Sequence, residues 1–297
     1  MDGRLAGMPW GERPSEGMVA LEQELRAAYL DLMKRALTFS LWPEPPVPVE
    51  YSNFRRSPAK RLLVSLVARA LRRKGFQLVR QHRYTDEERA SGRIWPGCAD
   101  TMIGIHRLEN IQYAVETLLA EGIEGDLIET GAWRGGACVF MRALLAAHGA
   151  RDRRVFVADS FEGLPKPDAA RHPADAGDPH HAFSILAVSE ESVRANFAKY
   201  GLLDDQVVFL KGWFKDTLPK APIEKLALLR LDGDMYGSTI DALESLYPKL
   251  SPGGFCIVDD YAAPAVRQAV GDYWTRQGIS PTLMEVDWTG RFWRKER

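Results

Sequence analysis

Three acidic residues come directly after two consecutive apolar segments of the chain. Asp232 ends the run 226–232, and Asp259 and Asp260 end the run 255–260. Because the carboxyl ends of parallel strands meet at one edge of a sheet, we expect the three carboxylates to lie together. Like charges about 4 Å apart repel by roughly 4 kcal/mol at an effective dielectric near 20, so such a cluster requires a counter-charge. Ligands that are all oxygen favour Mg²⁺ or Ca²⁺ over zinc, and the sequence therefore predicts a divalent metal site.

The same acidic residues have structural interpretations. Asp is common at helix N-caps and in turns, and either role would account for its presence after a strand. We favour the metal site because Ser238 or Thr239 is available to cap the following helix. Asp234 is open to two interpretations: with Asp232 it forms a metal-binding pair, as in many glycosyltransferases, or it supports the turn.

A glycine-rich turn forms the second candidate site. Gly131, Gly135 and Gly136 follow a short apolar run and precede a helical pattern, so their backbone can approach a ligand closely and offer N–H donors. Asp159 ends the next apolar run, at the position where an acidic side chain accepts the hydroxyls of a ribose. The combination predicts a nucleoside-containing ligand. Trp213 has two interpretations, stacking on the base or packing in the core.

These residues require a fold that gathers strand ends. From Thr101 onward, short apolar runs alternate with helical patterns, which is typical of a doubly wound α/β sheet. The sequence predicts strands at 127–129, 155–159, 207–211, 226–232 and 255–260, helices that begin near residues 135, 193, 238 and 264, and a final hairpin of 283–287 and 291–294. The hairpin would place an antiparallel strand beside a mostly parallel sheet.

The first part of the chain has a different pattern. We divide the chain into an N-terminal helical segment, 1–95, and a main domain, 96–297. In the first segment an apolar stripe over 21–37 predicts a helix, and the Pro-rich run 42–48 a linker. Residues 54–83 contain ten basic residues and no acidic one, with an apolar helix face over 62–71. This basic amphipathic helix either packs its apolar face on the main domain or contacts an anionic membrane surface or an acidic partner.

Composition excludes several classes of protein. The 297 residues include 39 Lys and Arg against 40 Asp and Glu, so no overall positive field attracts nucleic acid, and we expect no nucleic-acid partner. The three cysteines form no C-x-x-C pair, which argues against a disulfide framework and favours a reducing cytoplasm. No uncharged apolar run is long enough to predict a transmembrane segment.

Six stretches of the chain closely resemble the macrocin O-methyltransferase family. They are 100–104, 125–136, 157–165, 212–219, 231–234 and 257–261. The resemblance implies an enzyme dependent on S-adenosylmethionine and Mg²⁺ that methylates a sugar hydroxyl on a glycosylated small molecule of antibiotic biosynthesis. It also implies a class I methyltransferase fold, which is Rossmann-like and seven-stranded with added N-terminal helices, and a homo-oligomer.

The resemblance also assigns roles to individual residues. It implies that Asp232 is the general base and, with Asp259 and Asp260, a metal ligand. The residues it implies for the cofactor are Thr101, Met102, Glu129, Thr130, Gly131, Arg134, Gly135, Gly136, Asp159, Ser160, Gly212 and Trp213. A glycosyltransferase that uses Asp232 and Asp234, and a catechol-type phenol O-methyltransferase, remain as alternatives. The basic stretch 54–83 has no match in this pattern, and Asp100 stands where a neutral or imidazole side chain is expected.

Overall fold

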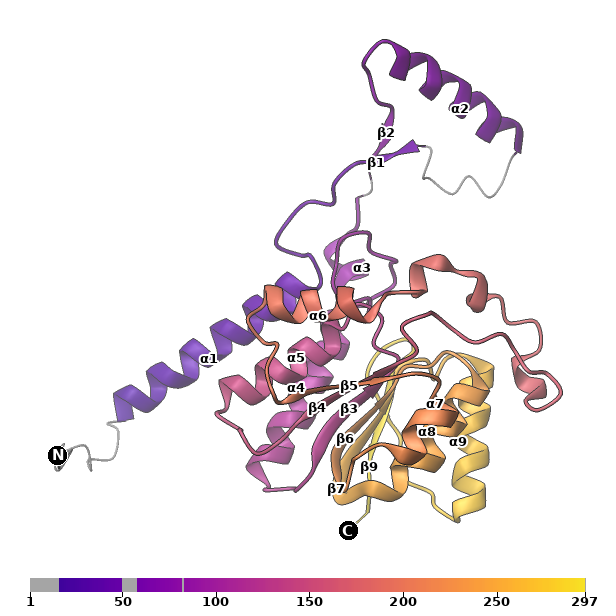
Figure 1. Cartoon of the computed structure of the whole chain (residues 1–297). Coiled ribbons are helices and arrows are strands. Elements are labelled where there is room, and N and C mark those ends of the chain that lie inside the picture. The colour runs from indigo at the N-terminus through magenta and orange to yellow at the C-terminus, as the bar shows by residue number, and fades with distance from the viewer. Residues whose placement is uncertain (1–15, 50–57, 82, 297) are drawn as a thin grey trace, which may run out of the picture.

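A seven-stranded sheet forms the centre of the computed structural model, which describes residues 16–49, 58–81 and 83–296 (Figure 1). The strand order is β5-β4-β3-β6-β7-β9-β8. The strands are β3 (Asp126–Thr130), β4 (Val155–Asp159), β5 (Val207–Lys211), β6 (Leu226–Leu231), β7 (Leu250–Val258), β8 (Met284–Glu285) and β9 (Arg291–Arg294). The first five of these pair in parallel, whereas β9 runs antiparallel to β7 and to β8. The predicted sheet with an antiparallel end is therefore confirmed.

Helices cover both faces of the sheet. The helices are α4 (Gly104–Ala120), α5 (Gly136–Ala147) and α6 (Glu190–Lys199) on one side and α7 (Phe214–Thr217), α8 (Tyr236–Leu246) and α9 (Pro264–Gln277) on the other. Short 3-10 helices span Pro173–Asp175, His180–Ala182, Ser184–Leu186, Leu218–Lys220 and Tyr247–Lys249. Each face has its own buried apolar cluster. Strand β6 is buried on both faces and is apolar except for Arg230, which is typical of a central parallel strand.

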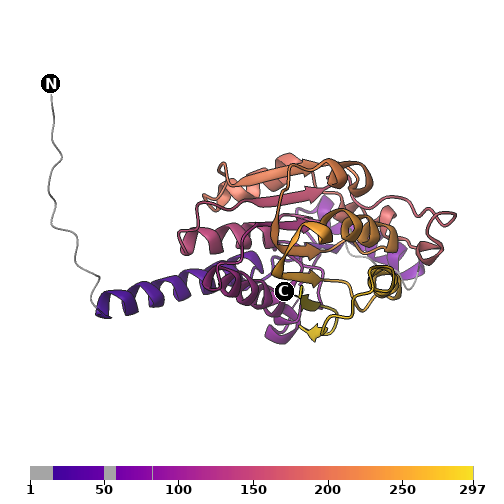
Figure 2. The same ribbon diagram turned by 90° about the horizontal axis from the view of Figure 1, so that it is seen from below.

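The N-terminal part contributes two long helices with different surroundings. The second half of α1 (Glu16–Leu37) packs on the main domain, because Leu30, Met33 and Leu37 join the cluster that contains α4 and α5. The first half of α1 projects beyond the domain, as Figure 2 shows from below. The remaining elements here are β1 (Val47–Pro48), β2 (Val79–Arg80), which pairs with β1, α2 (Pro58–Arg73) and the short α3 (Asp86–Ala90).

Helix α2 does not pack its apolar face on the main domain. It stands apart in Figure 1, and Leu62, Leu63, Leu66 and Val67 are all exposed. Among the described side chains of α2 only Ala68 is buried. The expectation that this face packs on the main domain is therefore wrong, because none of the elements that the structure describes covers it. Of the helices that the structure describes, none has both the length and the apolar composition to cross a bilayer.

Candidate active site

The three acidic residues lie together at the carboxyl edge of the sheet. Strands β6 and β7 are parallel neighbours, and their register places Leu231 beside Val258. The next residues along the two strands are therefore brought to the same point. One carboxylate oxygen each from Asp232, Asp259 and Asp260 lies within 4.8 Å of the other two. The arrangement of carboxylates that the strand ends predict is present, and all three ligand atoms are of the type that hard divalent cations prefer.

Two buried arginines contact this acidic cluster, and sequence reasoning missed both of them. Arg230, fully buried on β6, donates to Asp232 at 2.8 Å and pairs with Glu129 and Asp259. Arg107, on α4, pairs with the second oxygen of Asp259. A charged residue in the middle of a buried apolar strand is almost always paired. The position of Arg230 within an apolar run could therefore have indicated a buried acidic partner. The position of Arg107 gave no such indication, because its partner Asp259 is 152 positions away in the sequence.

The arginines do not balance all of the negative charge. Burial and repulsion from Asp259 raise the pKa of Asp232 to about 6, although Arg230 opposes the shift. Burial and the Asp232 charge raise the pKa of Asp234 to about 7, and burial places the pKa of Asp260 well above its usual range. Burial and mutual repulsion therefore make each of these carboxyl groups bind its proton more tightly than an exposed carboxyl group does. A divalent cation among them would replace those protons, so the donor set fits one.

The glycine-rich turn passes directly against the acidic edge. Gly131 has φ of 92°, and a Cβ there would lie 1.5 Å from the backbone oxygen of Asp232, so only glycine fits. Asp159, at the end of β4, fixes the same turn. One carboxylate oxygen, Oδ2, accepts a hydrogen bond from the backbone N–H of Ala132 at 2.7 Å. The other, Oδ1, accepts from the backbone N–H of Phe161 at 2.7 Å. The turn is therefore held in place before any ligand binds.

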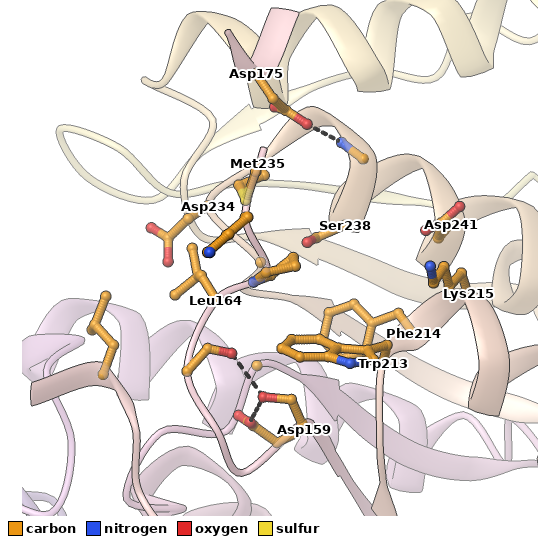
Figure 3. Close-up of a pocket in the computed structure, with 18 of the residues that line it drawn as sticks. Asp159, Leu164, Asp175, Trp213, Phe214, Lys215, Asp234, Met235, Ser238 and Asp241 are labelled. Carbon is orange, nitrogen blue, oxygen red and sulfur yellow. Dashed lines mark hydrogen bonds between the residues drawn. The ribbon is translucent and has the colours of Figure 1, made fainter. Parts of the chain in front are cut away.

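A cavity of about 230 Å³ opens beside this turn (Figure 3). Eight of the candidate site residues line it: Met102, Gly131, Asp159, Ser160, Gly212, Trp213, Asp232 and Asp234. In Figure 3 the indole of Trp213 lies beside Phe214, on the side of the cavity toward Asp159. Of the two interpretations of Trp213, the structure favours a wall of the cavity over core packing. Asp232 links the cavity to the acidic cluster.

The other residues predicted for the cofactor and the metal do not belong to the lining of the cavity. Thr101, Glu129, Thr130, Arg134, Gly135, Gly136, Asp259 and Asp260 do not line it. Several of them support it instead. Glu129 is buried, accepts from Cys138 Sγ at 2.8 Å and pairs with Arg230, and its burial raises its pKa to about 7. Arg134 donates to the carbonyls of Gly97 and Ala99, which fastens the segment before Thr101 to the glycine-rich turn.

A loop from Gly163 to Leu186 forms the remaining wall. Lys166, Arg171 and His172 are among the residues of this loop that line the cavity. Its Asp175 is buried and accepts from the backbone N–H of Tyr236 at 2.7 Å and of Gly237 at 2.9 Å. Asp175 therefore caps α8. The expectation that Ser238 or Thr239 caps this helix is wrong, because the helix begins at Tyr236, before either residue.

Comparison with known proteins assigns this chain to a family. Residues 26–295 match the family model described as Macrocin-O-methyltransferase (TylF). The chain is 50% identical over 275 residues to the 8-demethyl-8-(2,3-dimethoxy-alpha-L-rhamnosyl)-tetracenomycin-C 4'-O-methyltransferase of Streptomyces olivaceus, covering 92% of this chain and 95% of that one. It is 52% identical over 221 residues to the mycinamicin III 3''-O-methyltransferase of Micromonospora griseorubida, covering 73% and 87%.

A solved structure supports the same assignment. The O-methyltransferase NovP superposes with a TM-score of 0.78 at 44% identity, and the alignment covers 92% of this chain and all of that one. These matches favour methyl transfer over the glycosyltransferase alternative. The chain belongs to the macrocin O-methyltransferase family and is an O-methyltransferase.

Proposed function

We propose that this protein transfers a methyl group from S-adenosylmethionine to a sugar hydroxyl of a glycosylated antibiotic intermediate, with the help of Mg²⁺. The observation that carries the proposal is the position of Asp232, which belongs both to the acidic cluster and to the wall of the cavity. The names of the two relatives above, both sugar O-methyltransferases of antibiotic compounds, support the class of acceptor. The unpaired state of all three cysteines agrees with a reducing cytoplasm as the place of reaction.

The cavity side of the glycine-rich turn is the proposed cofactor site. Asp159 accepts from the backbone N–H groups of Ala132, Trp133 and Phe161 and, at 3.4 Å, from the Ser160 hydroxyl. Ribose hydroxyls bound by this carboxylate would take the place of the longer of these contacts. The Trp213 ring offers a flat apolar surface to the adenine. Met102 also lines the cavity, and it follows the segment to which Arg134 donates hydrogen bonds. Within the glycine-rich turn, Gly131 and Trp133 line the cavity, and Glu129 supports the turn through its ion pair with Arg230.

The acidic cluster is the proposed metal site. Asp232, Asp259 and Asp260 would hold Mg²⁺, which supplies positive charge that lowers the pKa of a nearby hydroxyl. Arg230 and Arg107 occupy oxygens of Asp259 from the buried side, so these bonds fix the orientation of that carboxylate. Such buried support keeps ligand atoms in place between turnovers.

Asp232 is the proposed general base. S-adenosylmethionine supplies the methyl group from a sulfonium, which becomes a neutral thioether as the carbon–sulfur bond breaks. Asp232 accepts the proton of the acceptor hydroxyl while the new oxygen–carbon bond forms. Arg230 donates to its Oδ2 atom, which stabilises the side chain in one orientation.

Two measurements test the proposed function. By calorimetry, S-adenosylmethionine should bind without metal, whereas a nucleotide sugar bound by a glycosyltransferase site would require it. In a methyl-transfer assay, glycosylated antibiotic intermediates with free sugar hydroxyls should be methylated, and their aglycones should not. Methylation of a catechol in preference to every glycoside would contradict the proposal of a sugar acceptor.

A further inference from the structure

A buried carboxylate stands apart from the acidic cluster. Asp100 is 7% exposed and belongs neither to that cluster nor to the lining of the cavity. It occupies a position where the family pattern predicted a neutral or imidazole side chain. One of its oxygens, Oδ2, accepts from Lys199 Nζ at 2.5 Å and from the Tyr200 hydroxyl at 2.6 Å. A carboxylate oxygen can accept both hydrogen bonds, whereas a neutral imidazole offers one acceptor nitrogen. Asp at this position is therefore matched to the end of α6.

The backbone of Asp100 joins it to two other helices. Its N–H donates to the carbonyl of Leu37, the last residue of α1, at 2.9 Å. Its carbonyl accepts from the N–H of Gly136, the first residue of α5, at 3.1 Å. A Cβ at Gly136 would lie 2.5 Å from that carbonyl oxygen, so the close approach requires glycine. Asp100 thus contacts α1 and α5 through its backbone and the end of α6 through its side chain.

The chain that follows Asp100 leads directly to the cavity. Thr101 is buried and also donates its N–H to Leu37, at 3.3 Å, and Met102 lines the cavity. Two residues of extended chain span at most about 7 Å, so a shift of Asp100 is passed on to Met102. The position of Met102 on the cavity wall therefore depends on the contacts that hold Asp100.

The two side-chain contacts of Asp100 differ in strength. The Lys199 side chain is 52% exposed, so its ion pair with Asp100 is screened by water and contributes little. Tyr200 is less exposed, and burial together with the hydrogen bond to Asp100 raises the pKa of Tyr200. Its phenol therefore keeps its proton and remains a donor near neutral pH. The hydrogen bond from Tyr200 is the main contact that ties the segment before Met102 to α6.

We infer that Asp100 is a positioning residue for the methyl donor, which holds Met102 on the cavity wall through its hydrogen bond with Tyr200. The inference rests on the proposed function, since it takes S-adenosylmethionine as the ligand of the cavity. Loss of Asp100 should weaken binding of this donor and leave Mg²⁺ binding unchanged, because the acidic cluster lies at the ends of β6 and β7. A merely structural role would lower stability without changing the donor affinity of the folded protein.

Calorimetry of S-adenosylmethionine binding to the full chain, well below the Tm of every variant, tests the inference. The dissociation constant should rise about tenfold in Asp100→Ala, which loses both contacts, and about threefold in Tyr200→Phe, which loses one. Asp100→Asn keeps an oxygen that can accept from Tyr200 and should recover most of the affinity. Mg²⁺ affinity should be the same in all of these proteins. Should Asp100→Ala fail to fold, Tyr200→Phe carries the same test.

Asp204→Ala is the matched control. Asp204 also follows α6 and accepts from Arg142 Nε at 3.0 Å, but it does not belong to the segment that leads to Met102. Its loss should lower the free energy of unfolding and leave S-adenosylmethionine affinity unchanged. Hydrogen exchange of the unliganded proteins gives a second readout. The backbone amides of 101–103 should exchange faster in Asp100→Ala and at the wild-type rate in Asp204→Ala.

Combination with Met102→Ala tests how Asp100 acts. If both residues act through the same contact, the losses of donor affinity in Asp100→Ala and Met102→Ala should not add in the double variant. Additive losses, wild-type affinity in Asp100→Ala, or an equal loss in Asp204→Ala would each overturn the inference while the proposed function stands. Absence of S-adenosylmethionine binding to the wild-type chain would instead overturn the proposed function, and the inference with it.

Discussion

Replacing Asp232 by Asn removes one negative charge from the acidic edge with little change of shape. The amide oxygen of Asn can still accept the hydrogen bond from Arg230 that Asp232 accepts at 2.8 Å. The fold should therefore be retained. What the variant loses is a proton acceptor on the cavity wall and one of the three carboxylate oxygens that lie within 4.8 Å of one another.

The size of both losses follows from this geometry. Unit charges 4.8 Å apart interact by about 3.5 kcal/mol at an effective dielectric near 20. A cation among the three oxygens would lose at least a comparable attraction, so Mg²⁺ affinity should fall about a hundredfold or more. Removal of a general base lowers rate by roughly a further 10²–10⁴-fold. Saturating Mg²⁺ should therefore recover only part of the activity.

Two assays separate these effects. Calorimetry measures Mg²⁺ and S-adenosylmethionine binding, and a methyl-transfer assay at saturating Mg²⁺ measures the remaining rate. Asp241→Asn is the matched control, because Asp241 also lines the cavity but stands outside the acidic cluster. Near-normal activity of Asp232→Asn, with unchanged Mg²⁺ dependence, would refute both the metal-ligand and the base assignments.

Further predictions concern the turn, the loop and the pH response. Asp159→Asn should weaken S-adenosylmethionine binding about tenfold or more and leave Mg²⁺ binding unchanged. The reason is that an amide cannot accept all the hydrogen bonds that Asp159 accepts. Calorimetry measures the affinity of the variant for each ligand. Asp175→Ala should lower the free energy of unfolding by about 1–2 kcal/mol, because two N–H groups of α8 lose their cap. Asp168→Ala, in the same loop, should change the free energy of unfolding little. Urea denaturation compares the two variants. In the presence of a chelator, stability should fall as pH rises from about 4 through about 7, since Glu129, Asp232 and Asp234 bind protons more tightly when folded. Mg²⁺ should then raise the Tm more at pH 8 than at pH 5, and an equal rise at both values would contradict the proton–metal competition.

The strand ends could be predicted from the sequence because their pattern is local. Apolar runs of five or six residues that end in Asp define β4 and β6 almost to the residue, and parallel pairing then fixes which ends meet. Strand β7 begins at Leu250, five residues before the predicted start, because the Pro-Gly-Gly in it obscures the apolar pattern. Helix α6 begins at Glu190 and not near Val193, since Ser189 caps it.

The surroundings of the site could not be predicted in the same way. The pairing of Arg107 with Asp259 and the capping of α8 by Asp175 join residues far apart in sequence, and neither partner type identifies the other. The packing of α2 was misjudged for a related reason. An amphipathic pattern shows that a helix has an apolar face, but it does not show which surface covers that face.

The most direct test of the account is anomalous scattering from crystals of the protein grown with S-adenosylhomocysteine and soaked in Mn²⁺. The account predicts one strong peak bounded by the carboxylates of Asp232, Asp259 and Asp260, next to the bound nucleoside. A peak elsewhere, or no peak while the nucleoside is in place, would contradict it.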